Sequence, residues 1–296
     1  MQKVNKDSYS FTILLIVSYV ISLIVLFYYA WDGFDYYKTP LLERAHHLDH
    51  QNIKPGGLRG HGLGVIGTFM MLLLLLYSLR KRSKIFGNIG QLTKWLDFHI
   101  FLGIMGPLFV VLHTAFKLNG IVALSFWSMI AVAVSGILGR YLYLQIPRNI
   151  NGHEMEYQEL VKIHETISPE LSSVYGIDDR HINSIEQMVV GKINVEKSLT
   201  NILFSLLLMD IQRFFRVRRI RHKLSLQTAL TKNQIVRLIE IIKKKAILHR
   251  RIILWNKIHQ LFHYWHVIHK PFAIIMYIIM VIHVVLTLIL GYKWVF

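Results

Sequence analysis

The stretch 269-HKPFAIIMYIIMVIHVVLTLIL-290 decides the fold class of this chain. From Pro271 onward it has no charged side chain, and a helix of about 20 apolar residues crosses a hydrocarbon layer about 30 Å thick. Four earlier apolar runs of similar length lie at 11–30, 61–79, 98–117 and 121–144. With the last run at 271–290, the sequence predicts an all-α integral membrane helical bundle with five transmembrane helices.

The numbers of histidine and cysteine residues limit which cofactors and cross-links the chain can hold. The chain has 16 histidines and no cysteine among its 296 residues. The absence of cysteine excludes disulfide bonds, cysteine-ligated iron–sulfur clusters and covalently attached c-type haem. Non-covalent binding at histidine remains open, because imidazole is a good ligand for iron.

Lysine and arginine are distributed unevenly along the chain. The formal net charge is +17, and the basic residues gather before the first span, at 80–97 and at 145–270, whereas 31–60 holds few. Loops rich in these residues stay on the cytoplasmic side. We therefore expect a multi-pass protein of a bacterial inner membrane, with a cytoplasmic N-terminus and a periplasmic C-terminus. Because this topology accounts for the positive charge, we expect no nucleic-acid partner.

Spans and charges together divide the chain into three parts. Residues 1–144 hold the first four transmembrane helices with an external loop at 31–60, residues 145–265 form a basic helical cytoplasmic insert, and residues 266–296 hold the fifth helix and the external C-terminus. Helices of the insert are expected near 154–168, 183–190, 201–224 and 232–268. The insert contains neither GxGxxG nor GxxxxGK(S/T), so we expect no nucleotide-binding domain.

The segment 201-NILFSLLLMDIQRFFRVRRIRHKL-224 interleaves arginines with apolar side chains in its second half. Such an amphipathic helix suits the surface of an anionic inner leaflet. A solvated helix that packs on its neighbours explains the same pattern, and the sequence leaves both interpretations open.

Histidines recur at one spacing in two of the predicted spans. His99 and His113 lie in the third span, His269 and His283 lie in the fifth, and each pair is 14 residues apart. Fourteen residues turn a helix by about 1400°, close to four full turns, and rise about 21 Å. Each pair therefore shares one face of its helix and has a member near each side of the membrane. Ionisable residues inside spans usually mark a function.

The third and fifth spans run in the same direction under this topology. If their histidine faces meet, His99 pairs with His269 at the cytoplasmic level and His113 pairs with His283 at the external level. Facing histidines in an apolar bundle can supply the axial ligands of non-covalent haem. The sequence thus predicts two haem b groups, with iron bound by His99 and His269 in the inner one and by His113 and His283 in the outer one.

Small and soft residues accompany the predicted ligands. Gly103 and Gly106 lie on the histidine face of the third span, and Ala273, Met276 and Met280 lie on that of the fifth. Residues of these kinds are compatible with a flat porphyrin beside them. A proton relay or a structural polar network is the alternative interpretation of the four histidines.

The paired segments 99-HIFLGIMGPLFVVLH-113 and 269-HKPFAIIMYIIMVIH-283 resemble the diheme membrane core of the ferric reductase and NADPH oxidase superfamily. Proteins of that superfamily carry paired histidines at this spacing on two helices and move electrons across the bilayer between two stacked haems. The resemblance covers 60–144 and 262–292, and it implies transmembrane electron transfer. The flavin and nicotinamide dehydrogenase of that superfamily has no counterpart here. The chain is therefore more similar to stand-alone bacterial b-type cytochromes that use separate redox partners.

Other polar residues are candidates for supporting roles. His61, at the outer start of the second span, is a candidate contact of the outer haem or of a quinone. Arg140 and Arg148, at the inner end of the fourth span, are candidate partners of haem propionates because guanidinium matches carboxylate. The positive-inside bias explains the same arginines. His46 and His50 would share a metal if they lay on one helix, and an external polar turn is the alternative.

Three histidines lie at the start of the fifth span. Only His269 repeats the 14-residue step to His283, so it is the expected inner ligand. His266 is the alternative inner ligand, and His263 is expected at the membrane interface. Pro271 cannot donate a backbone N–H, so we expect it to kink the helix, which could bring His266 forward in place of His269.

These observations predict an electron-transfer component of an oxidoreductase system. It would be a b-type cytochrome that relays electrons between a cytoplasmic or quinone donor and a periplasmic acceptor, or the reverse. Its expected partners are membrane lipid and a separate redox protein, either an iron–sulfur or flavin protein inside or a cytochrome outside. One alternative is a quinol-oxidising or quinone-reducing membrane-anchor subunit of a larger oxidoreductase. The other is a cofactor-free transporter or scaffold with a histidine proton relay.

Overall fold

The computed structural model describes residues 6–83, 89–148, 154–175, 178–191, 193–227 and 231–290. The predicted external C-terminus at 291–296 and part of the predicted basic loop, 84–88, lie outside these residues. The chain forms two compact units. Unit 1 comprises Met1–Leu138 and Val267–Phe296, and unit 2 comprises Gly139–His266.

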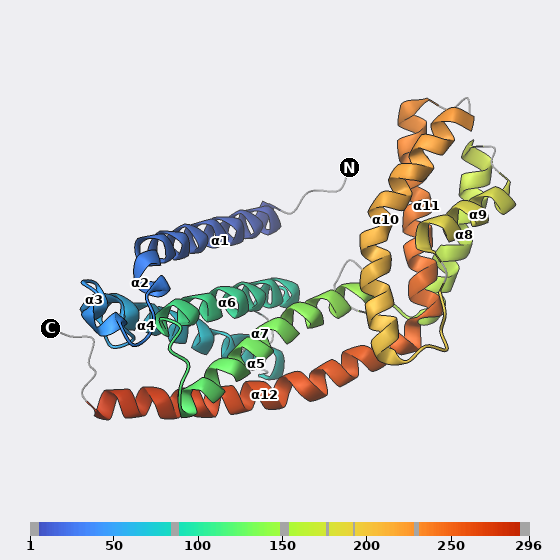
Figure 1. The fold of residues 1–296 in the computed structure, drawn as a ribbon. Helices are drawn as coiled ribbons and strands as arrows, with labels where there is room; N and C mark the ends of the chain where they lie inside the picture. The colour runs from blue at the N-terminus through green and yellow to red at the C-terminus, as the bar shows by residue number, and fades with distance from the viewer. Residues whose placement is uncertain are drawn as a thin grey trace. The chain divides into compact units, whose positions relative to one another are not determined.

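Every regular element in the described part of the chain is a helix (Figure 1). In chain order the elements are α1 (Lys6–Asp32), α2 (Phe34–Lys38), the 3-10 helix η1 (Arg44–His46), α3 (His50–Ile53), α4 (Leu58–Leu73), α5 (Leu75–Arg82), α6 (Leu92–His113), α7 (Ile121–Gln145), α8 (Tyr157–Tyr175), α9 (Asp179–Val190), α10 (Leu199–Gln227), α11 (Lys232–Ile253) and α12 (Trp255–Ile289). An isolated β-bridge joins Arg148 to Glu154. The all-α helical fold predicted from the sequence is confirmed.

Five stretches within the described residues are long and apolar enough to cross a membrane. They are Tyr9–Asp32, His50–Arg82, Leu92–His113, Val122–Gln145 and Trp255–Ile289. Large apolar side chains on their outer faces are exposed, as at Leu14 (64%) and Ile274 (60%), which suits contact with lipid. The five stretches contain or overlap the five predicted spans, and they support a multi-pass membrane protein.

The last span differs in outline from its prediction. The helix expected at 232–268 is divided at Leu254, and α12 begins at Trp255, well before the apolar run. Leu254 is buried in a core of unit 2, so packing rather than hydropathy sets this boundary. The helix then continues through Pro271 to Ile289, so the proline does not end it.

Glycines bring α4 and α6 close together in unit 1. Gly60, Gly64 and Gly67 recur at helical spacing on α4, and all three are buried. A Cβ atom on Gly64 would lie 2.6 Å from a ring nitrogen of His113, and one on Gly67 would lie 2.7 Å from a methyl of Val110. Small residues permit this close approach of helices within membranes. The distance between α4 and α6 therefore depends on glycine at these two positions.

Leu74 separates α4 from α5 in the middle of the second span. Near this break, the Met71 carbonyl accepts a hydrogen bond from the Tyr277 hydroxyl at 2.6 Å, and the Leu74 carbonyl accepts one from Nδ1 of His99 at 3.2 Å. Both carbonyls also accept a backbone N–H here, Met71 from Leu74 and Leu74 from Tyr77, each at 3.3 Å, so each side chain adds a second bond to its carbonyl. Side chains from α12 and α6 thus stabilise the break and attach both helices to the second span.

Arg44 holds the predicted external loop against the end of α6. The residue is buried, and its guanidinium donates to the carbonyls of Thr39 at 2.8 Å, of Tyr37 at 2.7 Å and of Ala115. Ala115 comes two residues after His113 and has a left-handed backbone with φ of 46°. The loop and the turn that follows His113 are therefore packed around one buried cation.

In unit 2, α11 lies at the centre of a helical bundle (Figure 1). Helices α8, α9 and α10 contact it, and α10 also contacts α9. Leu238, Ile242 and Ala246 recur every four residues on α11 and are completely buried, so they form one core stripe. Thr231 and Gln234 close a capping box at the start of this helix. The predicted helical insert thus has a core of its own.

α10 buries one face and exposes another. Leu206 and Ile220 are buried in the cores of unit 2. Phe204, Ile211 and Phe215 are each more than 60% exposed. Packing on neighbours, one of the two interpretations of this segment, is therefore observed, whereas contact of the exposed side with an anionic leaflet stays a prediction.

Asp210 of α10 is the centre of a polar network in unit 2. Its carboxylate accepts from Arg250 at 2.6 Å, from the Tyr141 hydroxyl at 2.8 Å and from Gln145 at 3.2 Å. The Gln145 amide oxygen also accepts from Arg250 at 2.9 Å, and Arg213 lies 3.0 Å from the carboxylate. Burial favours the neutral acid, but the bonds from Arg250 and Tyr141 outweigh it and lower the pKa of Asp210. The network joins α7, α10 and α11.

The substitution Asp210→Asn is expected to destabilise unit 2 by about 3–5 kcal/mol, because it leaves the Arg250 guanidinium buried without its carboxylate. Thermal unfolding of the detergent-purified chain, followed by circular dichroism, should show a lower midpoint. Glu196→Gln, at an exposed position before α10, is the control and should leave the midpoint unchanged.

Acid should remove the same stabilisation from the wild-type chain. The folded pKa of Asp210 lies below the unfolded value of about 3.9, so its contribution is complete above that value and is lost as pH falls through the folded pKa. The stabilities of wild type and Asp210→Asn should therefore converge as pH falls below about 4. Stability curves that stay parallel down to pH values well below that point would contradict the network.

Candidate functional site

His113 ends α6 and lies against α4. Its Nδ1 donates to the Gly60 carbonyl at 2.7 Å, and its ring lies over Gly64. A carbonyl oxygen can only accept, so Nδ1 carries the proton and the ring lone pair is on Nε2. Bonds of this kind fix the tautomer and the ring orientation of metal-binding histidines.

His99 is held in the same way near the other end of α6. Its Nδ1 donates to the Leu74 carbonyl at 3.2 Å, and its ring packs on Tyr77 with 5.0 Å between ring centres. Within the described part of the chain, Nε2 of neither His99 nor His113 has a hydrogen-bond partner. The two predicted ligands of α6 therefore share one tautomer, and both are supported by the second span.

His269 is bonded to α7. Nδ1 of His269 lies 2.6 Å from the Ser135 hydroxyl oxygen, which also lies 2.9 Å from the Val132 carbonyl. When the hydroxyl donates to Val132, its oxygen accepts from Nδ1. The ring also lies beside Gly136, where a Cβ atom would be 3.9 Å away. His99 and His269 thus have different supporting helices, and their pairing around an inner haem stays a prediction.

The other two histidines at the start of the last span are held differently. His266 donates from Nδ1 to the Phe262 carbonyl of its own helix at 2.9 Å, and its ring centre lies 4.5 Å from those of both Phe262 and Trp265. His263 is exposed. His269, by contrast, is bonded to a different span, which favours it over His266 as a positioned ligand.

The predicted outer ligands lie near one another. His113 interacts electrostatically with His283, and each of the two also interacts with His61 of α4. His283 lies half-buried on the inward stripe of α12, which also includes His269. The structure thus brings together three histidines of three helices, including His61, which the sequence suggested as a neighbour of the outer site.

Gly106, expected to lie beside a porphyrin, contacts the second span. A Cβ atom there would lie 3.3 Å from both Met70 and Met71, so side chains of α4 pack on Gly106, and its place beside a porphyrin stays a prediction. At Gly103, only one side-chain atom of the described residues comes within 4 Å, at 3.7 Å. Met276 is buried in the same core as Met70, so it serves helix packing.

The remaining candidates lie as follows. The Arg140 and Arg148 guanidinium groups lie 5.6 and 4.1 Å from the ring centre of Tyr143, and their role toward haem propionates stays a prediction. The two histidines of the predicted external loop lie in different elements. His46 is exposed in η1, whereas His50 begins α3 and bonds to the Tyr36 hydroxyl. These two histidines occupy separate short elements, so the one helix required for a shared metal does not form.

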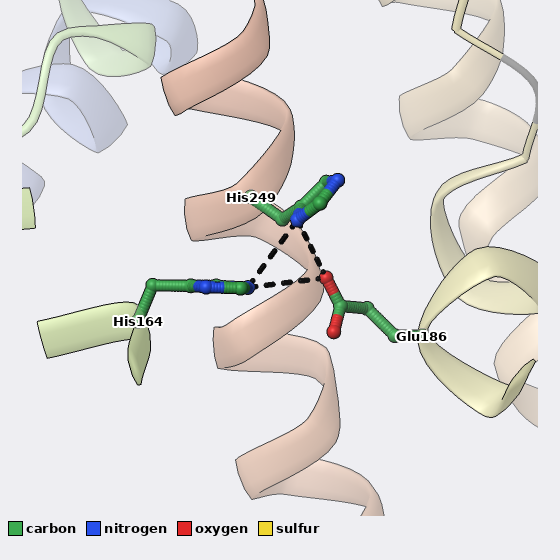
Figure 2. Close-up of side chains that lie close together, drawn as sticks. All are labelled: His164, Glu186 and His249. Carbon is green, nitrogen blue, oxygen red and sulfur yellow. Dashed lines mark hydrogen bonds and ion pairs between the residues drawn. The ribbon is translucent and has the colours of Figure 1, made fainter. Parts of the chain in front are cut away.

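Three side chains of unit 2 meet in a cluster that the sequence analysis did not single out (Figure 2). Oε1 of Glu186 in α9 lies 3.3 Å from Nε2 of His164 in α8 and 3.1 Å from Nδ1 of His249 in α11. The two nitrogens are 3.3 Å apart. The three residues come from separate helices and are far apart in the sequence, so no local spacing could have indicated them.

Charge and burial keep the cluster compatible with metal binding. Burial lowers the pKa of His249, and the charges of His164 and Lys245 lower it further against the opposing effect of Glu186. A lowered pKa favours the neutral imidazole, which is the form that binds metal ions. The cluster is therefore a second candidate site, separate from the histidines of the spans.

Comparisons with known proteins identify no relative: no family model, no curated protein and no solved structure matches the chain. The function must therefore be inferred from the residues and their geometry.

Gly64→Ala should displace the His113 ring, because the added Cβ atom would lie 2.6 Å from Nδ1. Overpacking of this kind typically costs about 1–3 kcal/mol, so the midpoint of thermal unfolding in detergent should fall. Gly103→Ala is the matched control, since its nearest neighbour would be 3.7 Å away. Its midpoint should stay equal or rise, because alanine favours a helix over glycine by about 1 kcal/mol. Equal effects of the two substitutions would contradict the close packing of α4 on α6.

Proposed function

We propose that this chain is a b-type cytochrome of a bacterial inner membrane that relays electrons across the membrane. In this proposal His99 and His269 bind an inner haem b, and His113 and His283 bind an outer one. The observation that carries the proposal is the shared tautomer of His99 and His113, each of which donates a hydrogen bond from Nδ1 to a backbone carbonyl.

The donor set fits a haem held by two histidines. Haem iron takes an imidazole nitrogen as its axial ligand, and a proton held on Nδ1 leaves the Nε2 lone pair for the metal. The supporting partners of His99 and His113 are backbone carbonyls, and that of His269 is the Ser135 hydroxyl. Such partners orient a ligand and raise its basicity.

When bound, haem supplies a one-electron carrier that alternates between ferric and ferrous iron. The residues of the chain position the ligands and exclude water. The carbonyls of Gly60 and Leu74 hold the two rings of α6 at fixed orientations. The apolar core of unit 1 gives the site a low dielectric constant, and the dielectric constant around a buried metal affects its redox potential. His99 and His113 are about 21 Å apart along the helix axis, so they serve opposite sides of the membrane.

Partners and orientation belong to the same proposal. The basic residues favour a cytoplasmic N-terminus and a cytoplasmic insert at 145–265, with the C-terminus in the periplasm. Electrons would be exchanged with a separate redox protein, either an iron–sulfur or flavin protein inside or a cytochrome outside. The exposed apolar and arginine side chains of α10 are the proposed contact with anionic lipid. The similarity in histidine spacing to the diheme core of ferric reductases supports this assignment.

His61 favours a second candidate, a quinol-oxidising or quinone-reducing subunit of a larger oxidoreductase. It lies close enough to both predicted outer ligands to interact with them electrostatically, and its imidazole N–H is a possible donor to a quinone oxygen. Reduction of the haems by a quinol analogue, blocked by His61→Ala, would select this candidate. In a protein without a cofactor, the same three histidines would instead serve as a proton relay.

The purified chain should show the alpha band of a b-type cytochrome in its reduced-minus-oxidised spectrum. The pyridine haemochrome assay should give about two haems per chain, one for each pair of axial histidines. His113→Ala should remove about half of the haem and spare the inner site, because His99 is supported by a different carbonyl. Wild-type protein that is folded but colourless would contradict the proposal. That result would favour the interpretation of the histidines as a proton relay.

His269→Ala and His266→Ala distinguish the two candidates for the inner ligand. His269 is bonded to Ser135 of another span, whereas His266 is bonded to its own helix. We therefore expect His269→Ala to lose the inner haem and His266→Ala to keep both haems with at most a small spectral shift. The reverse result, measured by the same assay, would assign the ligand to His266.

A further inference from the structure

The cluster of His164, Glu186 and His249 has no part in the proposed electron transfer. We propose that it binds one divalent transition-metal ion, with Zn²⁺ as the expected occupant, and that the ion ties α8, α9 and α11 together (Figure 2). The site lies entirely within unit 2.

The spacing of the three ligand atoms matches a metal polyhedron. Zinc binds nitrogen and oxygen at about 2.0–2.1 Å in a tetrahedron, so two ligand atoms of one ion lie about 3.3 Å apart. The three separations in the cluster are 3.3, 3.1 and 3.3 Å. The atoms thus form one triangular face of the expected tetrahedron before any ion is added.

The types of ligand atom limit which metal ion can bind. Two imidazole nitrogens and one carboxylate oxygen form a mixed set that zinc accepts, and three protein ligands with an open fourth position are typical of zinc sites that bind water or substrate. Calcium and magnesium prefer oxygen ligands, so they are poor candidates. The chain contains no cysteine to compete for the ion.

Lys245 positions the carboxylate. Its ammonium is 2% exposed and donates to Oε2 of Glu186 at 2.7 Å and to the Asn183 side chain at 3.1 Å. Oε2 is thereby occupied on one side, while Oε1 faces the two imidazoles. Hydrogen bonds from outside the ligand set commonly fix a metal-binding carboxylate in this way.

Without an ion, hydrogen bonds satisfy the three groups only in part. If both rings donate to Oε1, two N–H groups of like polarity lie with their nitrogens 3.3 Å apart. If only one ring donates, its N–H is shared between Oε1 and the nitrogen of the other ring, and the lone pair of that second ring also faces the carboxylate oxygen. A cation among the three atoms satisfies all three, because each atom then directs a lone pair toward the ion.

The site is also accessible. The His249 side chain is 44% exposed, whereas Glu186 is 6% exposed and His164 is 20% exposed. An ion can therefore enter from the side of His249, and a water molecule there can complete its coordination.

The test uses the full chain in detergent, stripped of metal with a chelator and titrated with zinc chloride alone. Calorimetry and elemental analysis should show one tightly bound zinc per wild-type chain, counted separately from haem iron. His249→Gln and His164→Gln should each lose this equivalent or weaken its binding by at least about tenfold to a hundredfold. His181→Gln, at an exposed position on the helix that carries Glu186, is the matched control and should keep the zinc.

Two results would overturn the proposal: a wild-type chain that binds no zinc, or variants of His249 and His164 that both keep the same equivalent. Zinc should also raise the midpoint of thermal unfolding of the wild type and of His181→Gln but not that of His249→Gln. Because the His249 side chain is 44% exposed and lies outside the apolar core of unit 2, its substitution should leave the helical content unchanged, and circular dichroism checks this. The haem content should stay the same in every variant. The zinc proposal is therefore tested independently of the electron-transfer proposal.

Discussion

Hydrogen bonds from imidazole nitrogens to main-chain carbonyls organise unit 1, and they depend on how closely α6 approaches the second span. His113 reaches the Gly60 carbonyl because Gly64 leaves space for its ring. His99 reaches the Leu74 carbonyl because the helix is broken there. Each bond orients a histidine and attaches α6 to the second span. The candidate haem ligands are therefore also structural partners of the second span.

A different constraint governs unit 2, where charges are buried beside apolar cores. Asp210 gathers donors from α7 and α11, and Lys245 is bonded to Glu186 between α9 and α11. A buried charge without its partner is costly, so these pairs restrict the arrangements that the helices can adopt. The Asp210–Arg250 and Glu186–Lys245 pairs join α10 and α9 to α11, as the apolar stripe of α11 also does, so these polar and apolar contacts support one another.

The helical fold could be predicted because apolar runs of span length and amphipathic runs are local properties of the sequence. The break at Leu74 could not, since 70-MMLLLLLY-77 contains neither glycine nor proline and the carbonyls there are bonded by residues distant in the sequence. The candidate ligands could be found from their 14-residue repeat, but the helix that supports each ring depends on tertiary packing. The packing of Met70 against Gly106 and the formation of the cluster around Glu186 also depend on tertiary packing.

The location of the acceptor separates two kinds of histidine in this chain. His266 donates from Nδ1 to the Phe262 carbonyl, four residues earlier in its own helix, at 2.9 Å. Such a bond fixes a ring relative to its own helix only. His99 and His113 donate to another helix, and the rings at Glu186 likewise meet a carboxylate from a third. A ring held across helices takes its place only when those helices pack. Formation of either candidate site is therefore coupled to the tertiary fold, and a bound ion or cofactor would stabilise that fold in return.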